Sequence, residues 1–475
     1  MLYGKQVNEM RTAIKPKWLS DKLTITRIGI LFVVSIFFLA ELFAHVGIGW
    51  DFAVHYLNGL ALTNPGFYAK SAAVHGNVIS KGIYFEPFRA PLSYFMMTAL
   101  IVVNRGIAVY AYAILTLVLL FISVLYVSKY MDVDRTMFAA LTITPLVLGF
   151  MLINGADILT FALLVISLGF LLRKSSYFGL FLGLACLAKY TSLIFLPMLL
   201  LLWRPKKIIV ASLLFAVVTI PWLAFNMVYF GGTLYSYATQ MNVAFNSVNI
   251  GINPIVFIVF AYPVFALILY VWLNRRSGSA YNKLKDGNKR HYFVFSTFLA
   301  LAIVSSLLVL PNQPNLANQM RFMSPLGFGA AALVCLYIGK SKSTHSRNVN
   351  DNNQGLLPIL LLVITVAGFL ASPLYLSYVN AGSPTSSEIY SAISDMQSLG
   401  ITGCAVVSNA WVWLNYYNTI SFSPFYYNTT VSSYPIIIFN NTGVSSMPEW
   451  IYGSTLALKR NGTSVYLPNN YICAG

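Results

Sequence analysis

Long apolar runs recur along almost the whole chain, and polar or basic residues separate them. A transmembrane helix needs about 20 predominantly apolar residues. Charged residues make up only 9% of the chain and hydrophobic residues 58%, whereas soluble domains carry roughly 25% charged residues. Water cannot be the solvent for so much apolar surface, so we predict an α-helical polytopic membrane protein. About eleven runs are long enough, or nearly so, to span: 28–49, 106–127, 137–153, 158–172, 176–188, 191–203, 207–224, 251–273, 292–310, 322–339 and 356–378.

A twelfth apolar run, 91–103, decides the topology. If it does not span and the N-terminus is inside, 22 of the 30 lysines and arginines lie on the cytoplasmic side. If it spans, most of the later basic loops move outside, against the positive-inside rule. We therefore expect 91–103 to be a juxtamembrane segment, with eleven spans and a C-terminus outside the cell membrane.

Three regions follow from this topology. Residues 1–27 form a basic cytoplasmic N-terminus, residues 28–378 the transmembrane domain with a first external loop at 50–105, and residues 379–475 an extracytoplasmic domain. The N-x-S/T sequons, at Asn428, Asn440 and Asn461, all lie in the last region. They favour an external tail, although a segment rich in Asn, Ser and Thr also produces sequons by chance.

The C-terminal region is expected to be a small mixed α/β domain. It contains a helical stretch, Glu388 to Gln397, and two β-branched or aromatic runs, 404–407 and 434–439. Cys404 and Cys473 lie in this polar region and are candidates for a disulfide if it is external. Cys186 and Cys335 lie inside apolar runs and read as inert packing residues.

The net charge of +17 does not indicate a nucleic-acid partner. Basic residues cluster between the apolar runs instead of along one face or in a tail, so they are topology signals. The cysteines and histidines form no zinc-ligand pattern, and no metal ligands are assigned.

The first external loop begins with a polar stripe. Asp51, His55 and Asn58 recur at i, i+4 and i+7 on an otherwise apolar segment, which predicts a helix along the membrane surface with the stripe facing a cavity. Asp51 is a candidate catalytic carboxylate. The alternative is that it caps the helix, because Asp begins helices well.

Further charged residues lie near the outer face. Glu86 and Arg89 either pair with each other or serve separately, Arg89 on an anionic ligand and Glu86 on an acceptor. Asp157 follows Asn154-Gly155-Ala156 at the outer end of a helix, where it is either functional or a cap.

Lys189 lies in a hairpin, and Arg321 is expected to open a helix. Both lie on the expected outer side, against the positive-inside trend. They either snorkel or bind a phosphate.

These residues resemble motifs of the GT-C superfamily of integral-membrane glycosyltransferases, which includes protein O-mannosyltransferases and aminoarabinose transferases. The resemblance covers roughly residues 28–340. It rests on six stretches in order: Gly49-Trp50-Asp51, Arg89-Ala90-Pro91-Leu92, Asn154 to Leu159, Gly183 to Lys189, Pro221-Trp222 through Gly231, and Arg321 to Pro325. One departure is that Phe52 follows Asp51 where the mannosyltransferases have an Asp-Glu pair, so the donor sugar is open.

The resemblance implies a transferase that moves a sugar from a polyprenyl-phosphate carrier to a glycan, lipid or protein acceptor at the outer face. Asp51 would be the general base, and Glu86 or Asp157 would orient the acceptor. Arg89, Lys189 and Arg321 would bind the phosphate, and His55 and Asn58 are further substrate-binding candidates. The family's monophosphate users often need no tightly bound metal, and whether this chain uses a divalent metal is open.

Two other classes remain open. The first is a transporter or lipid flippase, although the chain shows no inverted repeat. The second is a non-catalytic subunit, which would not need carboxylates grouped around the first loop.

Overall fold

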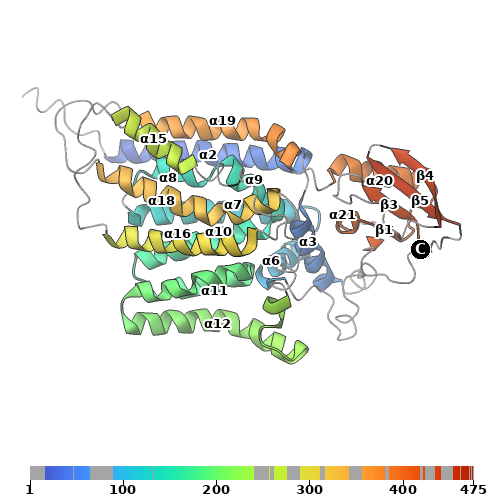
Figure 1. The fold of residues 1–475 in the computed structure, drawn as a ribbon, viewed down its shortest axis with the longest axis horizontal. Coiled ribbons are helices and arrows are strands. Elements are labelled where there is room, and N and C mark those ends of the chain that lie inside the picture. Colours follow the sequence, from blue (N-terminus) through green and yellow to red (C-terminus); the bar gives the residue numbers. More distant parts are fainter. Residues whose placement is uncertain are drawn as a thin grey trace, which may run out of the picture.

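The computed structural model shows a helical bundle with a small sheet-containing domain at one end (Figure 1). The structure describes residues 17–45, 48–64, 89–131, 133–239, 256, 262–274, 289–310, 316–341, 356–379, 384–417, 421–422, 434–439, 453–460, 462–469, 471 and 473. The long helices run side by side along the length of the molecule, and the C-terminal domain lies beyond the end that carries α3 (Trp50–Thr63) and α6 (Pro91–Val103).

Four of the described helices are long and apolar enough to cross a membrane. They are α2 (Lys17–His45), α7 (Ala108–Met131), α12 (Pro205–Phe230) and α16 (Lys289–Val309). Helix α12 exposes Leu213, Val217 and Ile220 at 59%, 67% and 54% of their surface. A continuous apolar face of this kind is a liability in water and is normal against lipid. The fold is therefore that of a helical membrane protein, and the number of eleven spans stays a prediction.

Further apolar helices complete the bundle. They are α10 (Ala156–Leu172), α11 (Tyr177–Ala188), the 3₁₀ helix η1 (Tyr190–Leu202), α15 (Tyr262–Asn274), α18 (Ser324–Ser341) and α19 (Leu356–Val379). Helix α10 packs between α7 and α11, and α11 packs on α12. The 13 residues of η1 reach farther than an α-helix of equal length, because a 3₁₀ helix rises about 2.0 Å per residue instead of 1.5 Å.

Two sequence expectations about helices were wrong. The run 137–153 is not one helix but two, α8 (Arg135–Thr142) and α9 (Pro145–Asn154), since Pro145 cannot donate the hydrogen bond that would continue α8. Arg321 does not open a helix. It lies in the last turn of the short α17 (Leu316–Phe322), and α18 begins after it. Of the expected span 251–273, only Val256 and α15 belong to the described residues.

Two short helices pack together at the end of the bundle that faces the C-terminal domain. They are α3 (Trp50–Thr63) and α6 (Pro91–Val103). Gly59 allows this close approach, because a Cβ there would lie 3.0 Å from the backbone nitrogen of Thr98. At 1.5 Å per residue, the 13 residues of α6 reach about 20 Å, short of the hydrocarbon thickness of about 30 Å. Helix α11 has only 12 residues and is an expected span, so length alone does not separate the two, and the juxtamembrane position of 91–103 stays a prediction.

The C-terminal domain is built from a five-stranded mixed sheet in the order β2-β1-β3-β5-β4. Its helices are α20 (Ser386–Ser398) and α21 (Trp411–Tyr416), and its strands are β1 (Val406–Ser408), β2 (Ser421–Phe422), β3 (Ile436–Phe439), β4 (Ser454–Arg460) and β5 (Thr463–Pro468). Strand β1 is parallel to β2 and β3, whereas β5 is antiparallel to β3 and β4. A capping box between Thr385 and Glu388 begins α20.

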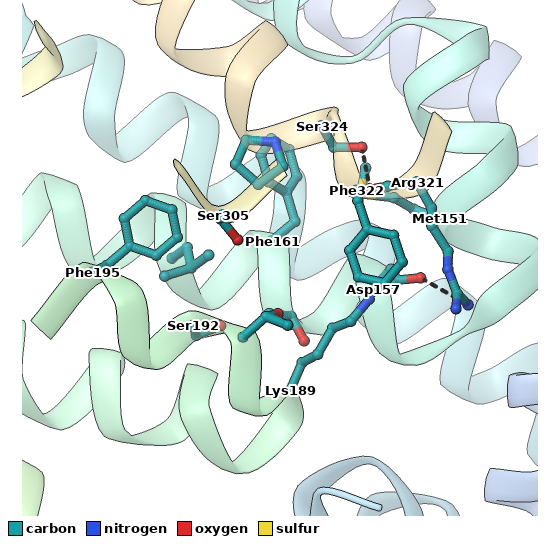
Figure 2. A pocket seen from close by; sticks show the side chains of 14 residues that line it. Met151, Asp157, Phe161, Lys189, Ser192, Phe195, Ser305, Arg321, Phe322 and Ser324 are labelled. Atoms are coloured by element: carbon teal, nitrogen blue, oxygen red, sulfur yellow. Dashed lines mark hydrogen bonds and ion pairs between the residues drawn. The ribbon is translucent and has the colours of Figure 1, made fainter. Parts of the chain in front are cut away.

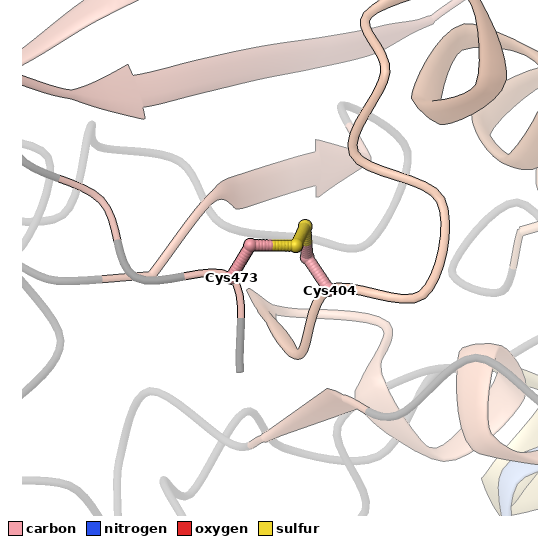
Figure 3. The surroundings of a disulfide bond; sticks show 2 residues. All are labelled: Cys404 and Cys473. Atoms are coloured by element: carbon pink, nitrogen blue, oxygen red, sulfur yellow. A yellow bond between two sulfur atoms is a disulfide. The ribbon is translucent and has the colours of Figure 1, made fainter. Parts of the chain in front are cut away.

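A disulfide joins Cys404, just before β1, to Cys473 near the C-terminus (Figure 3), and their Cα atoms lie 4.6 Å apart. It closes a loop of most of the domain and thereby restricts the unfolded chain. Cys186 and Cys335 are free and buried. The sequons lie outside the described residues.

The C-terminal domain contacts the helix that carries the polar stripe. The indole Nε1 of Trp413 in α21 donates to the carbonyl oxygen of Ile48, 2.8 Å away and two residues before α3. The rings of Tyr56 and Tyr416 meet edge to face with their centroids 4.9 Å apart. Thus the domain packs on the outer side of α3.

Candidate functional site

Helix α3 begins at Trp50, and its N-cap is Gly49. Asp51 lies in the first turn and is not the capping residue, so the capping interpretation of Asp51 was wrong. Its carboxylate instead accepts hydrogen bonds from cations. Arg89 Nη1 lies 2.7 Å from Oδ1, and Arg321 Nη1 pairs with Oδ2.

The two arginines reach Asp51 from distant parts of the sequence. Arg89 stands just before α6, and Arg321 ends α17. All three side chains are at most 19% exposed. Burial alone would favour the neutral acid, but the positive charges of Arg89 and Arg321 outweigh it and hold the pKa of Asp51 well below its usual value. Asp51 is therefore an anion that two guanidiniums compensate.

A second ion pair lies beside the first. Asp157, in the first turn of α10, pairs with Lys189, the residue that links α11 to η1. Arg321 Nη1 lies 3.7 Å from Asp157 Oδ2, so Arg321 connects the two carboxylates. Figure 2 shows Lys189 and Arg321 converging on Asp157. The interpretation of Asp157 as a cap was also wrong, because the N-cap of α10 is Gly155.

Phe322 covers both cations. Its ring centroid lies 3.9 Å from Lys189 Nζ and 4.9 Å from Arg321 Cζ. Cation–π contacts of this kind hold a cation in place without supplying a counter-charge. The ring adds no negative charge to that of the two carboxylates.

Gly155 sets the distance between the two carboxylate helices. Its φ is +66°, and a Cβ there would lie 2.5 Å from the ring of Phe52 in α3. Only glycine fits both the backbone and the space. Gly155 thus lets the start of α10 approach α3, which brings Asp157 near Asp51.

We define the charge cluster as Asp51, Arg89, Asp157, Lys189 and Arg321. The cluster contains three cations and two carboxylates. Counted over the described residues, its net charge is therefore one positive charge. Each of the five side chains is mostly buried. A largely desolvated cluster with a net positive charge is suited to an anion, and a phosphate can accept several of its donors at once.

His55 and Asn58 lie on the same face of α3 and are buried. The ring of His55 lies roughly parallel to that of Tyr94 in α6, with centroids 6.4 Å apart. Burial and the charge of Arg89 lower the pKa of His55 to about 3, so its imidazole is neutral at neutral pH. Among the described residues, no hydrogen-bond partner reaches its Nδ1.

Glu86, the third candidate carboxylate, lies outside the described residues. The described residues hold no group of three or more His, Cys, Asp or Glu placed to share a metal ion. This leaves the question of a divalent metal open.

Two cavities adjoin the charge cluster. The first, of about 40 Å³, extends from Asp157, Lys189 and Arg321 into the bundle, where Ser192 and Ser305 line it (Figure 2). The second, of about 230 Å³, lies between α11, η1 and α12 and is almost entirely apolar. Tyr190 and Trp222 line this second cavity.

Tyr190 connects the apolar cavity to the charge cluster. Its hydroxyl donates to the carbonyl oxygen of Arg89, 3.4 Å away, and accepts from Trp222 Nε1 at 2.6 Å. Sequence reasoning assigned no role to Tyr190, Trp222, Tyr94 or Phe322. The available signal was their position: Tyr190 and Phe322 directly follow the two cations, and Trp222 follows Pro221.

Comparison of the chain with known protein families, with curated proteins and with solved structures gives no match.

Proposed function

We propose that this protein is a membrane glycosyltransferase that moves a sugar from a polyprenyl-phosphate carrier to an acceptor. The observation that carries the proposal is the charge cluster, in which three cations from separate elements surround two carboxylates. Such a transferase needs cations for the phosphate and a carboxylate for the acceptor hydroxyl. The cluster offers both within one ion-pair network.

The phosphate of the donor would compete with Asp51 for Arg89 and Arg321. A phosphate presents more acceptor oxygens than a carboxylate, and guanidinium groups bind it in a bidentate manner. Once the arginines turn to the phosphate, Asp51 loses part of the compensation that holds its pKa low. Donor binding would thereby raise the basicity of Asp51 when it is needed.

In the reaction, the acceptor oxygen forms a bond to the anomeric carbon as the bond from that carbon to the phosphate oxygen breaks. Asp51 takes the proton of the acceptor hydroxyl, and the bonding electrons leave with the polyprenyl phosphate. Arg89, Arg321 and Lys189 stabilise the negative charge that develops on it. Asp157 holds Lys189 in place and, with Glu86, is a candidate to orient the acceptor.

The apolar cavity supports a lipid-linked donor. Tyr190, which lines it, donates to the backbone carbonyl of Arg89, and the lining is almost free of polar surface. An isoprenoid chain near its phosphate end requires an apolar surface next to cations. We propose further that the N-terminus is cytoplasmic and that the charge cluster faces the outer side together with the C-terminal domain.

The test uses the purified full-length protein in liposomes with polyprenyl-phosphate hexoses and pentoses, and native membrane extract as the source of acceptor. Mass spectrometry measures the release of free polyprenyl phosphate. Asp51→Asn should lower turnover by about a hundredfold or more. The matched control is Asp134→Asn, which removes the cap carboxylate of α8 at the other end of the bundle and should leave turnover unchanged.

Other outcomes would contradict the proposal. Movement of the labelled lipid between leaflets without sugar release would identify a flippase. Full turnover of Asp51→Asn would reduce Asp51 to a structural role and leave Asp157 or Glu86 as the base.

A further inference from the structure

A third cavity, with a basic rim, lies at the end of the bundle away from the charge cluster. It measures about 840 Å³ and lies where the turn between α10 and α11 meets the start of α12. Arg173, Lys174 and Lys207 line it, together with Ser175 and Ser176. Among the described residues, its lining contains no Asp or Glu to neutralise the three cations.

The wall of this cavity below the basic rim is apolar and aromatic. Phe170 and Phe181 stack with their ring centroids 5.0 Å apart and their planes 11° from parallel. Leu180, Val210 and Leu214 continue the wall along α11 and α12. The cavity thus has cations at its mouth and an apolar surface that runs along the helices.

The backbone keeps the rim in position. The carbonyl oxygen of Lys174 accepts from Lys207 Nζ, and the hydroxyl of Ser176 donates to the carbonyl oxygen of Lys207 at 3.1 Å. Helices α11 and α12 also approach closely at Gly179. A Cβ on this residue would overlap the carbonyl group of Ala211, so the absence of a side chain permits the approach. The rim is therefore tied across two elements and is not a pair of free loops.

Two lysines at the start of α12 favour an anion nearby. Lys206 and Lys207 lie in its first turn, which carries no acidic residue. The N-terminus of a helix is already partially positive, so two lysines there are unfavourable without a negative partner. A phosphate at the rim would relieve this repulsion and would also meet Arg173 and Lys174.

We infer that this cavity is a binding site for an anionic phospholipid, with the headgroup phosphate on Arg173, Lys174 and Lys207 and an acyl chain along the aromatic wall. Basic pockets between transmembrane helices are suited to anionic headgroups. The apolar wall favours a lipid over a free phosphate, because an inorganic anion would leave that wall unused. This site is separate from the charge cluster, so its test does not depend on the proposed reaction.

The experiment is native mass spectrometry of the purified protein with phosphatidylglycerol and with phosphatidylcholine of the same acyl chains. We expect phosphatidylglycerol to bind about tenfold more tightly or better. The variant Arg173→Gln, Lys174→Gln, Lys207→Gln should lose at least about tenfold of that affinity. The matched control is Arg27→Gln, Arg135→Gln, Lys289→Gln, which removes three cations outside the cavity lining and away from the start of α12 and should lose less than about twofold.

Two further measurements separate a lipid from a soluble anion. Val210→Trp fills the apolar wall and keeps every charge, so it should weaken phosphatidylglycerol binding even if the triple variant does not fold. Inorganic phosphate at millimolar concentration should not displace the lipid. Equal affinity for the two lipids, equal losses in both triple variants, displacement by phosphate, or no effect of Val210→Trp would each overturn the inference.

Discussion

Asp51 forms ion pairs with two largely buried guanidinium groups. Removing the charge of Asp51 would leave both guanidinium groups buried without this carboxylate. Asp51→Asn leaves Arg89 and Arg321 without their shared carboxylate, and we expect a loss of about 3 kcal/mol in the free energy of unfolding. Removing Arg89 as well should restore part of this loss, since Arg321 still has Asp157 within 3.7 Å. Denaturation in detergent micelles of the single variants and of Asp51→Asn/Arg89→Gln measures the coupling.

This cycle separates stability from catalysis. The double variant should regain stability but not sugar transfer, because neither the base nor one phosphate ligand is restored. Strictly additive effects of Asp51→Asn and Arg89→Gln would mean that the ion pair contributes nothing to the fold.

The buried His55 makes stability depend on pH. Its pKa is lowered to about 3 in the folded state, from 6.5 in an unperturbed histidine. Between these values the unfolded chain binds a proton that the folded chain does not. Stability is therefore complete above about pH 7 and falls with acidification, by about 1.4 kcal/mol per pH unit.

The measurement compares melting of the wild type and His55→Gln between pH 7.5 and 5. The other histidines are common to both proteins, so the difference isolates His55. Asp51 does not contribute in this window: its pKa lies below the ordinary 3.8, so its ion pairs weaken only at lower pH. A difference in melting temperature that stays constant with pH would contradict the burial of a neutral His55.

At the residue scale, sequence reasoning found the charged members of the site and missed the aromatic ones. Arg89, Lys189 and Arg321 were identifiable because few cations lie on the side of the membrane that the charge pattern predicts to be external. Phe322 and Tyr190 directly follow Arg321 and Lys189, but they stand among many aromatic residues in apolar runs, and this position alone does not show what their rings contact. Which carboxylate meets which cation could not be predicted, because Asp51 and Arg321 are 270 positions apart in the sequence and only the tertiary fold brings them together.

At the element scale, apolar periodicity located most helices but not their breaks. The ranges expected for α10, α11 and α19 agree closely with the structure. Pro145 divides the expected helix 137–153, and a proline can also be accommodated within a transmembrane helix, as Pro221 is in α12. The 3₁₀ geometry of η1 has no sequence signature, because its apolar run contains no period that separates it from an α-helix.

Gly155 is the residue through which helix packing controls the site. Gly155→Ala would place a Cβ 2.5 Å from the ring of Phe52 and would hold alanine at a φ of +66°. We expect a loss of about 2–3 kcal/mol in stability and a large loss of turnover as α3 and α10 separate. Phe52→Leu in the same chain should recover part of the stability, because it relieves the overlap and leaves the backbone strain.

The control for this substitution is Gly29→Ala in α2, where a Cβ meets nothing within 4 Å. It should be neutral or slightly stabilising, since alanine favours a helix interior. If Gly155→Ala melts like Gly29→Ala, the close approach of α3 and α10 does not determine the site.

At the scale of the whole molecule, the two ends of the bundle differ in charge and in partners. The charge cluster and the C-terminal domain occupy one end, with Trp413 hydrogen-bonded to the chain just before α3. The basic cavity occupies the other end, where Arg173 and Lys207 meet. A membrane between these ends would place the proposed reaction beside the C-terminal domain and the phospholipid site at the opposite leaflet.

Single cysteines introduced into a chain without reactive native thiols test this orientation. Ala280→Cys and His345→Cys lie in segments expected to be cytoplasmic, and Thr430→Cys lies in the expected external domain. In intact cells, a membrane-impermeant thiol reagent should label position 430 and spare positions 280 and 345. After the cells are permeabilised, all three should react, which shows that the spared cysteines are shielded by the membrane and not by protein. Labelling of position 280 from outside would add 91–103 to the spans, reverse every later loop and place most of the basic residues outside, contrary to the physical basis of the topology.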